Sequence, residues 1–166
     1  MSGQVLVSAC LLGAAVRYNG GSATSAHPVL ARWLEEGRVV AVCPEVEGGL
    51  GVPRPPAEIA AAAGGLRVLR GEAAVVTNQG VNVSTQFIAG AERAVELARE
   101  RGIRVAVLKE GSPSCGSSWV YDGSFQGVRV PGLGVTAAAL TAAGVQVFSE
   151  SQLEQAAEAL DGSTAR

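Results

Sequence analysis

The amino-acid sequence predicts an α/β protein with a single-domain, three-layer, Rossmann-like open sheet that is mostly parallel and carries a small β-hairpin. Three observations support this prediction. Short valine-rich apolar runs recur along the chain, helical patterns separate them, and 166 residues are enough for one domain with a buried core. Strands that alternate with helices pair in parallel through right-handed crossovers. No repeat and no linker divides residues 1–166.

Four largely apolar runs are predicted to be buried strands, because each is short and rich in valine. They are residues 5–9, 39–42, 105–108 and 145–148. A small hairpin is predicted where residues 66–69 and 73–77 flank the turn sequence Arg70-Gly71-Glu72. The long segment 43–58 is rich in glycine and proline and is predicted to be a shaped binding loop.

Helical patterns with recognisable start and stop residues separate the strands. Pro28 suits the first position of a helix, and Ser84 suits the N-terminal cap of another. The last helix is predicted from the capping-box pattern that starts at Ser151, and residues 161–166 after it are expected to fray. The predicted helices are residues 28–36, 84–101, 136–143 and 151–160.

The composition narrows the class of protein. The chain is 48% hydrophobic and 17% charged, with a net charge of −2 and no basic stripe, so a nucleic-acid duplex is not the expected partner. No run approaches the ~18–20 apolar residues that cross a membrane. Three cysteines without close spacing do not form a disulfide framework, and we therefore expect a protein of the reducing cytoplasm.

The three cysteines follow three different predicted strands. Because ligands of open parallel sheets bind at the carboxyl ends of the strands, we expect Cys10, Cys43 and Cys115 to meet in one crevice. Three convergent thiols suggest a metal centre with one open position, although each thiol could equally be a small buried hydrophobe. Zinc would need a fourth ligand, and the one histidine, His27, is expected at a helix start on the surface. An iron–sulfur cluster, normally held by four thiolates, would have one iron without a protein thiolate.

Carboxylates accompany the cysteines. Glu45 lies two residues after Cys43, so its carboxylate is expected close to any metal held there, where it could act as a general acid or base. Glu47 and Glu110 are expected to be solvated loop residues. The serines at 112 and 114 stand directly before Cys115 and could take part in proton transfer.

Other polar groups near the predicted strand ends could bind a small anionic substrate. The candidates are Ser114, Lys109, Arg17 and the backbone N–H groups of Gly21 and Ser22. Each of them is also typical of an ordinary turn or a surface charge. No Walker motif and no GxGxxG sequence follows a strand, so nucleoside triphosphates and dinucleotides are not expected ligands.

Five motifs occur together and in order along the chain. They are residues 5–13 (VLVSACLLG), 17–22 (RYNGGS), 43–46 (CPEV), 53–59 (PRPPAEI) and 108–116 (LKEGSPSCG). This set resembles the thiouracil desulfidase family, and the resemblance extends over residues 4–150.

The resemblance implies a 4Fe–4S cluster held by Cys10, Cys43 and Cys115, with the fourth iron open to substrate. It implies removal of sulfur from a thiolated pyrimidine, such as 2- or 4-thiouracil or 4-thiouridine monophosphate, to give the uracil compound and sulfide without net electron transfer. The acid–base carboxylate and the serine of the family fall on Glu45 and Ser112, with the serine at 114 as the neighbouring alternative.

Two other functions compete with a desulfidase. A metal-free cysteine sulfurtransferase would need one thiol of low pKa and no bound iron. A non-catalytic iron–sulfur redox or sensing module would bind iron without turning over a thiopyrimidine. A fully ligated cluster would favour the second alternative, but the chain has only three cysteines.

Overall fold

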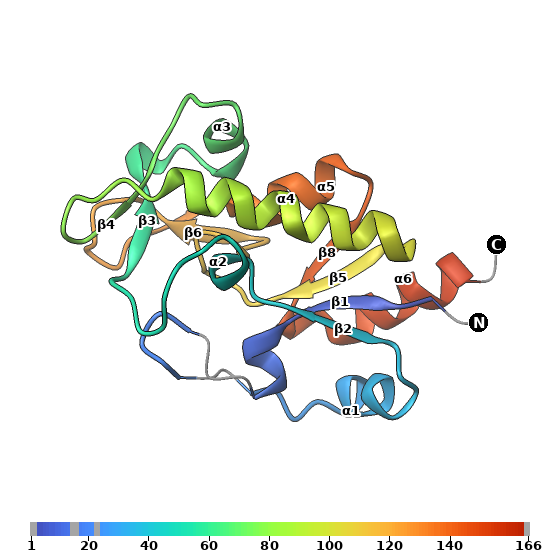
Figure 1. Cartoon of the computed structure of the whole chain (residues 1–166). Coiled ribbons are helices and arrows are strands. Elements are labelled where there is room, and N and C mark those ends of the chain that lie inside the picture. The colour runs from blue at the N-terminus through green and yellow to red at the C-terminus, as the bar shows by residue number, and fades with distance from the viewer. Residues whose placement is uncertain (1–2, 14–16, 22–23, 165–166) are drawn as a thin grey trace.

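The computed structural model describes residues 3–13, 17–21 and 24–164 and has a four-stranded parallel sheet at its centre (Figure 1). The strands lie in the order β2-β1-β5-β8, and all three pairings are parallel. Their bounds are β1 (Val5–Ser8), β2 (Val39–Val42), β5 (Val105–Leu108) and β8 (Gln146–Ser149). The predicted parallel sheet is confirmed, but only the central strands β1 and β5 are buried along their whole length, whereas the edge strands β2 and β8 are partly exposed. The last strand begins and ends one residue later than predicted.

Helices cover both faces of this sheet, which confirms the three-layer prediction (Figure 1). Val5 and Val7 of β1 face the helices α1 (Pro28–Glu35) and α6 (Leu153–Thr164). Leu6, between them, faces the helices α4 (Ser84–Arg101) and α5 (Val135–Ala142). Side chains alternate along a strand, so a strand that is apolar at every position is buried on both faces.

A third apolar cluster lies beyond the carboxyl ends of the strands. It joins the helix α3 (Gly65–Leu69) to the first half of α4 through Val68, Phe87 and Val135. Two antiparallel strands, β3 (Ala57–Ile59) and β4 (Val75–Thr77), complete this unit. Figure 1 shows α2 (Pro44–Glu47), β3, β4 and β6 (Trp119–Tyr121) gathered at the left of the molecule, where the strands of the main sheet end.

The predicted hairpin is wrong in its residues. Residues 66–69 belong to the helix α3, and β4 pairs with β3 rather than with them. Gly65 packs so closely on the backbone of Gly134 that a side chain there would overlap it, and Val68 is fully buried. A second antiparallel pair occurs elsewhere, between β6 and β7 (Arg129–Pro131), in a segment for which no strand was predicted.

Several predicted ends also differ. The segment predicted as one long loop contains the four-residue helix α2. The capping box belongs to Ser149 and Gln152, around the 3-10 helix η3 (Glu150–Gln152), and not to Ser151. The last helix continues to Thr164 instead of fraying from residue 161. The other 3-10 helices are η1 (Ala9–Leu12) and η2 (Ala60–Ala62).

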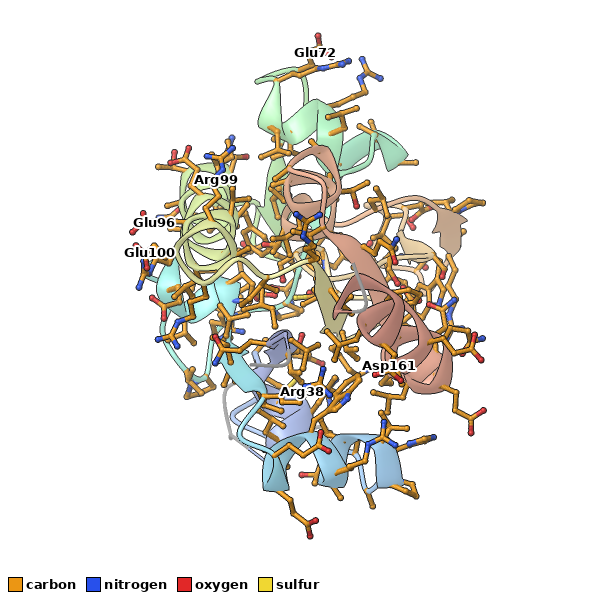
Figure 2. The ribbon with its side chains drawn as sticks, turned by 90° about the vertical axis from the view of Figure 1, so that its right-hand side faces the viewer. Arg38, Glu72, Glu96, Arg99, Glu100 and Asp161 are labelled. Atoms are coloured by element: carbon orange, nitrogen blue, oxygen red, sulfur yellow. The ribbon has the colours of Figure 1, made fainter. Side chains whose placement is uncertain are left out.

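The outer surfaces of the helices are charged. Figure 2 shows Glu96, Arg99 and Glu100 along the outer side of α4, and Arg93 of the same helix forms an ion pair of 2.7 Å with Glu96. Within the described ranges, no helix is both long enough and apolar enough to cross a membrane.

Candidate functional site

A cavity of about 510 Å³ opens at the carboxyl edge of the sheet. Cys10, Cys43 and Cys115 all line it, although they come from segments far apart in the chain. Each follows a different strand, and those strands, β1, β2 and β5, lie side by side. The parallel sheet therefore brings the three thiols to one place, at the edge where such sheets bind ligands.

Cys10 lies in η1, directly after β1, and is buried. Burial raises the pKa of its thiol, and the neighbouring Cys43 raises it further. The positive charges of Arg17 and Lys109 act in the opposite direction. Burial and Cys43 outweigh the two cations, so the surroundings of Cys10 favour the protonated thiol when no metal is bound.

Cys43 is the residue before the short helix α2, and Pro44 takes the first helical position. Burial raises the pKa of the Cys43 thiol, while the backbone N–H of Val46 lowers it and the carboxylate of Glu45 raises it. Because α2 begins at once after Cys43, its first turn carries Glu45 into the same cavity.

Cys115 lies in a loop that is hydrogen-bonded to the N-terminus of α5. The backbone N–H groups of Val135 and Thr136 donate to the carbonyls of Pro113 and Ser114, each at 2.8 Å. These donors belong to the first turn of α5, whose N–H groups have no partner within the helix. The loop carbonyls therefore accept the free N–H groups at the start of α5, and these hydrogen bonds hold the loop in place.

The Cys115 thiol is the most strongly perturbed of the three. It is 5% exposed, and burial raises its pKa to about 12. The hydroxyls of Ser114 and Ser8 contact the sulfur at 3.4 Å and 3.7 Å and oppose that rise. A buried thiolate would thus have hydrogen-bond donors already in place.

A carboxylate and two hydroxyls form a connected network beside the thiols. Glu45 Oε2 accepts from the hydroxyls of Ser114 at 2.9 Å and Ser112 at 3.2 Å, and the two hydroxyls are 2.8 Å apart. Glu45 Oε1 accepts from Arg54 Nε at 3.0 Å. The ion pair is largely buried, with side-chain exposures of 7% for Arg54 and 15% for Glu45. Glu45 is therefore held from both sides.

Glu110 is not the solvated loop residue that was expected. Its Oε1 accepts four backbone N–H groups, those of Gly111, Ser117, Ser118 and Trp119, at 2.8–3.4 Å. Burial alone would raise its pKa, but the N–H groups outweigh that effect and the pKa is lowered. Glu110 closes the loop that carries the two serines and the third cysteine, and so acts as its anchor. Glu47, by contrast, is exposed as expected.

The other predicted substrate-binding residues lie in different settings. Arg17 and Lys109 line the cavity, and Lys109 Nζ forms an ion pair of 2.9 Å with Glu150. The N–H of Gly21 donates to the side chain of Asn19 at 2.8 Å, within its own turn. Ser22 lies outside the described residues.

Sequence reasoning missed one wall of the cavity. Trp119, Tyr121 and Arg129 come from the pair β6–β7 and share one face of it, with the Arg129 guanidinium 3.9 Å from the centre of a Trp119 ring. The alternation of residues 119–121 around the buried Val120 is the signal that could have predicted this strand. Glu150, which directly follows β8 and pairs with Lys109, was missed as well, although it does not itself line the cavity.

The donor chemistry of the cavity is that of three thiols without a histidine. Among the described residues, no three histidine, cysteine or carboxylate side chains gather around a point that could hold one metal ion. His27 caps α1, where its Nδ1 accepts from Val29 N at 3.1 Å, and it is not part of the cavity wall. Three thiols spread around one cavity are the soft ligands that an iron–sulfur cluster takes.

Comparison with known proteins identifies relatives along almost the whole chain. A family described as 2-thiouracil desulfurase matches residues 5–152. The uncharacterized protein YbbK of Bacillus subtilis (strain 168) is 43% identical over 149 residues, covering 90% of this chain and 97% of that relative. The solved structure of the 4Fe–4S-dependent thiouracil desulfidase TudS is 48% identical, with a TM-score of 0.87 and coverage of 96% of this chain and 98% of that one.

Proposed function

Since this chain belongs to the 2-thiouracil desulfurase family, we propose that it removes sulfur from a thiolated pyrimidine with a 4Fe–4S cluster. Cys10, Cys43 and Cys115 would hold the cluster and leave one iron open. The single observation that carries the proposal is the position of Glu45, whose carboxylate is bonded to two hydroxyls inside the cavity that the three thiols line. A site of that kind offers metal ligands and a proton acceptor together.

The proposed reaction is a hydrolysis: a thiocarbonyl and water give a carbonyl and hydrogen sulfide, with no net electron transfer. When bound, the cluster would supply an open iron that binds the thiocarbonyl sulfur and draws electron density from the ring carbon. Glu45 takes a proton from the attacking water or gives one to a ring nitrogen. Arg54 on Oε1 and the hydroxyls on Oε2 hold that carboxylate in place.

Of the two serines, Ser112 is the one that we assign to the reacting oxygen. Ser114 is 2% exposed, whereas Ser112 is half-buried and reachable from the cavity. The oxygen of Ser112 accepts the N–H groups of Ser114 and Cys115 at 3.0 Å and 3.2 Å, and its one proton lies on Glu45 Oε2 at 3.2 Å. In the reaction that proton would turn to the substrate oxygen, while the shorter bond from Ser114 stays on the carboxylate. A hydrogen bond to the oxygen that forms on the ring carbon would lower the barrier by a few kcal/mol.

The proposed substrate is a thiopyrimidine base or its nucleotide. Arg17 and Arg129 line the cavity and have no carboxylate partner among the described residues, which suits the phosphate of 4-thiouridine monophosphate as well as a neutral base. Activity on 2-thiouracil, 4-thiouracil and 4-thiouridine monophosphate would distinguish these substrates by kcat/KM. An oxygen-sensitive cluster also suits the reducing cytoplasm, which we propose as the location.

The metal-free alternative is disfavoured. A cysteine nucleophile needs a depressed thiol pKa, but burial raises the pKa of all three thiols here. The sensing alternative would bind the same cluster without turning over a thiopyrimidine, so an assay of sulfide release from a thiouracil distinguishes it from a desulfidase.

The test begins with anaerobic purification and analysis of iron and sulfide. We expect about four irons per chain, release of sulfide from a thiouracil, and loss of iron in Cys10→Ala. Glu45→Gln should keep the iron and lose turnover, while Glu47→Gln, on the exposed side of the same helix, should keep both. A colourless protein that resists cluster reconstitution would overturn the cluster, and full turnover in Glu45→Gln would remove Glu45 from the mechanism.

A further inference from the structure

Ser8 lies at the end of β1 and is 3% exposed. Its hydroxyl oxygen accepts from the backbone N–H of Lys109 at 2.9 Å and contacts Cys115 Sγ at 3.7 Å. Among the described residues, these are the only two hydrogen-bond partners of the Ser8 hydroxyl. A hydroxyl has one proton to donate, and a buried donor without an acceptor is costly. The sulfur of Cys115 is therefore the acceptor for that proton.

The direction of this bond is set by the backbone of the neighbouring strand. Lys109 follows β5, and its N–H can only donate, so Ser8 must accept there. Glu150 fixes the same stretch of chain, because its carboxylate accepts from Glu110 N at 2.8 Å and pairs with Lys109 Nζ at 2.9 Å. A Cys115 that ligates iron carries no proton of its own, which leaves Ser8 as the donor.

The second hydroxyl at this sulfur is not committed in the same way. The single proton of Ser114 has three acceptors within reach: Ser112 Oγ at 2.8 Å, Glu45 Oε2 at 2.9 Å and Cys115 Sγ at 3.4 Å. The carboxylate is 0.5 Å closer to this hydroxyl than the sulfur is, and a charged oxygen acceptor makes a stronger bond than a neutral hydroxyl. The Ser114 hydroxyl therefore donates to Glu45 rather than to the Cys115 sulfur.

We propose that Ser8 is a positioning residue for the cluster, the dedicated hydrogen-bond donor to the Cys115 thiolate. This inference rests on the proposed function. Hydrogen bonds to the sulfurs of an iron–sulfur cluster help to set its reduction potential, and outer partners tune the first ligands. By taking up negative charge on the Cys115 sulfur, Ser8 stabilises the reduced cluster and makes the open iron a better acceptor for the substrate sulfur.

The test measures the midpoint potential of the cluster in the absence of substrate. Ser8→Thr keeps the hydroxyl and adds a methyl group, Ser8→Val has the shape of threonine with a methyl group in place of the hydroxyl, and Ser8→Ala removes the hydroxyl. We expect the Thr variant to match the wild type. In the Val and Ala variants the equilibrium should shift about tenfold towards the oxidised cluster, a fall of about 59 mV for a one-electron couple. Iron content and melting temperature are recorded for each variant.

The matched control is Ser149→Ala. Ser149 ends β8, which lies on the far side of β5 from β1, and is 1% exposed, but its hydroxyl bonds to Ser151 and not to a cysteine. It should lose stability without a change in potential.

Equal potentials in the Thr and Val variants would overturn the inference, and so would a Thr variant that no longer holds iron. Loss of iron in the Ala and Val variants alone, with iron retained in the Thr variant, would support it. A wild-type chain that binds no cluster overturns the proposed function and this inference together. A bound cluster whose potential is insensitive to residue 8 overturns only the inference.

Discussion

Gly90 of α4 lies against the carbonyl of Pro44 in α2 so closely that a side chain at position 90 would overlap it. A second close approach, between Gly48 and the backbone of Gln86, joins the same two helices. The short helix α2 cannot be stable alone. The position of α2 depends on two glycines, Gly48 and Gly90, that allow its backbone to pack directly on that of α4. The positions of Cys43 and Glu45 depend on it in turn.

Gly90→Ala should therefore displace α2. Alanine favours a helix by about 1 kcal/mol over glycine, but overpacking against a backbone costs about 1–3 kcal/mol, so we expect a lower melting temperature and less iron per chain after reconstitution. Gly162→Ala is the matched control, because Gly162 lies in α6 with nothing within 4 Å of an added methyl group. That variant should be slightly more stable than the wild type, and equal effects of the two substitutions would contradict the packing argument.

Glu110→Gln should weaken the loop that carries Cys115. The four N–H groups on Glu110 Oε1 would lose a charged acceptor, and hydrogen bonds to charged groups contribute about 1.5–3 kcal/mol. We expect a lower melting temperature at neutral pH.

The same anchor predicts a pH dependence. Burial raises the pKa of Glu110 less than its N–H donors lower it, so the folded pKa lies below the ordinary glutamate value of 4.5. Its stabilising contribution is present above that value and is lost as the pH falls through the folded pKa. The difference in melting temperature between wild type and Glu110→Gln should thus shrink below about pH 4.5; a constant difference down to pH 3 would argue against the anchor.

Arg54→Met should leave a largely buried carboxylate without its ion-pair partner. Removing one partner of a buried pair costs about 3–5 kcal/mol, and the cavity beside Glu45 places this site at the lower end. Denaturant unfolding measures the loss, and kcat should fall because Glu45 is no longer held. Arg67→Met is the control: its pair with Glu72 is 59% and 52% exposed, and an exposed pair contributes at most about 1 kcal/mol.

Arg129→Met tests the wall made by β6 and β7. If Arg129 meets a phosphate, KM should rise for 4-thiouridine monophosphate and stay unchanged for 4-thiouracil. The Arg129 guanidinium also lies over a Trp119 ring. Arg129→Lys keeps the positive charge but not the planar group over that ring, so we expect it to restore the KM only in part. A parallel rise of KM for both substrates would assign Arg129 to the shape of the cavity instead of to an anion.

The main sheet could be predicted from local pattern alone. Runs of valine and leucine that are apolar at every position have few options besides a strand buried on both faces, and Val5, Leu6 and Val7 are indeed fully buried. The run at residues 66–69 was misassigned, because a short apolar run does not distinguish a strand from a buried helical turn. The packing of Gly65 on Gly134, 69 positions later in the chain, decided it.

That three thiols follow predicted parallel strands, and so lie at one edge of the sheet, could be inferred from the local pattern of residues, because parallel strands place their carboxyl ends at the same edge. The strand order, and the groups that meet at that edge, emerge only from the folded chain. Ser112 reaches Glu45 across 67 residues and Lys109 reaches Ser8 across 101. Such bonds depend on strand order and on how each loop closes, and a hydrogen bond between distant segments leaves no local pattern in the chain.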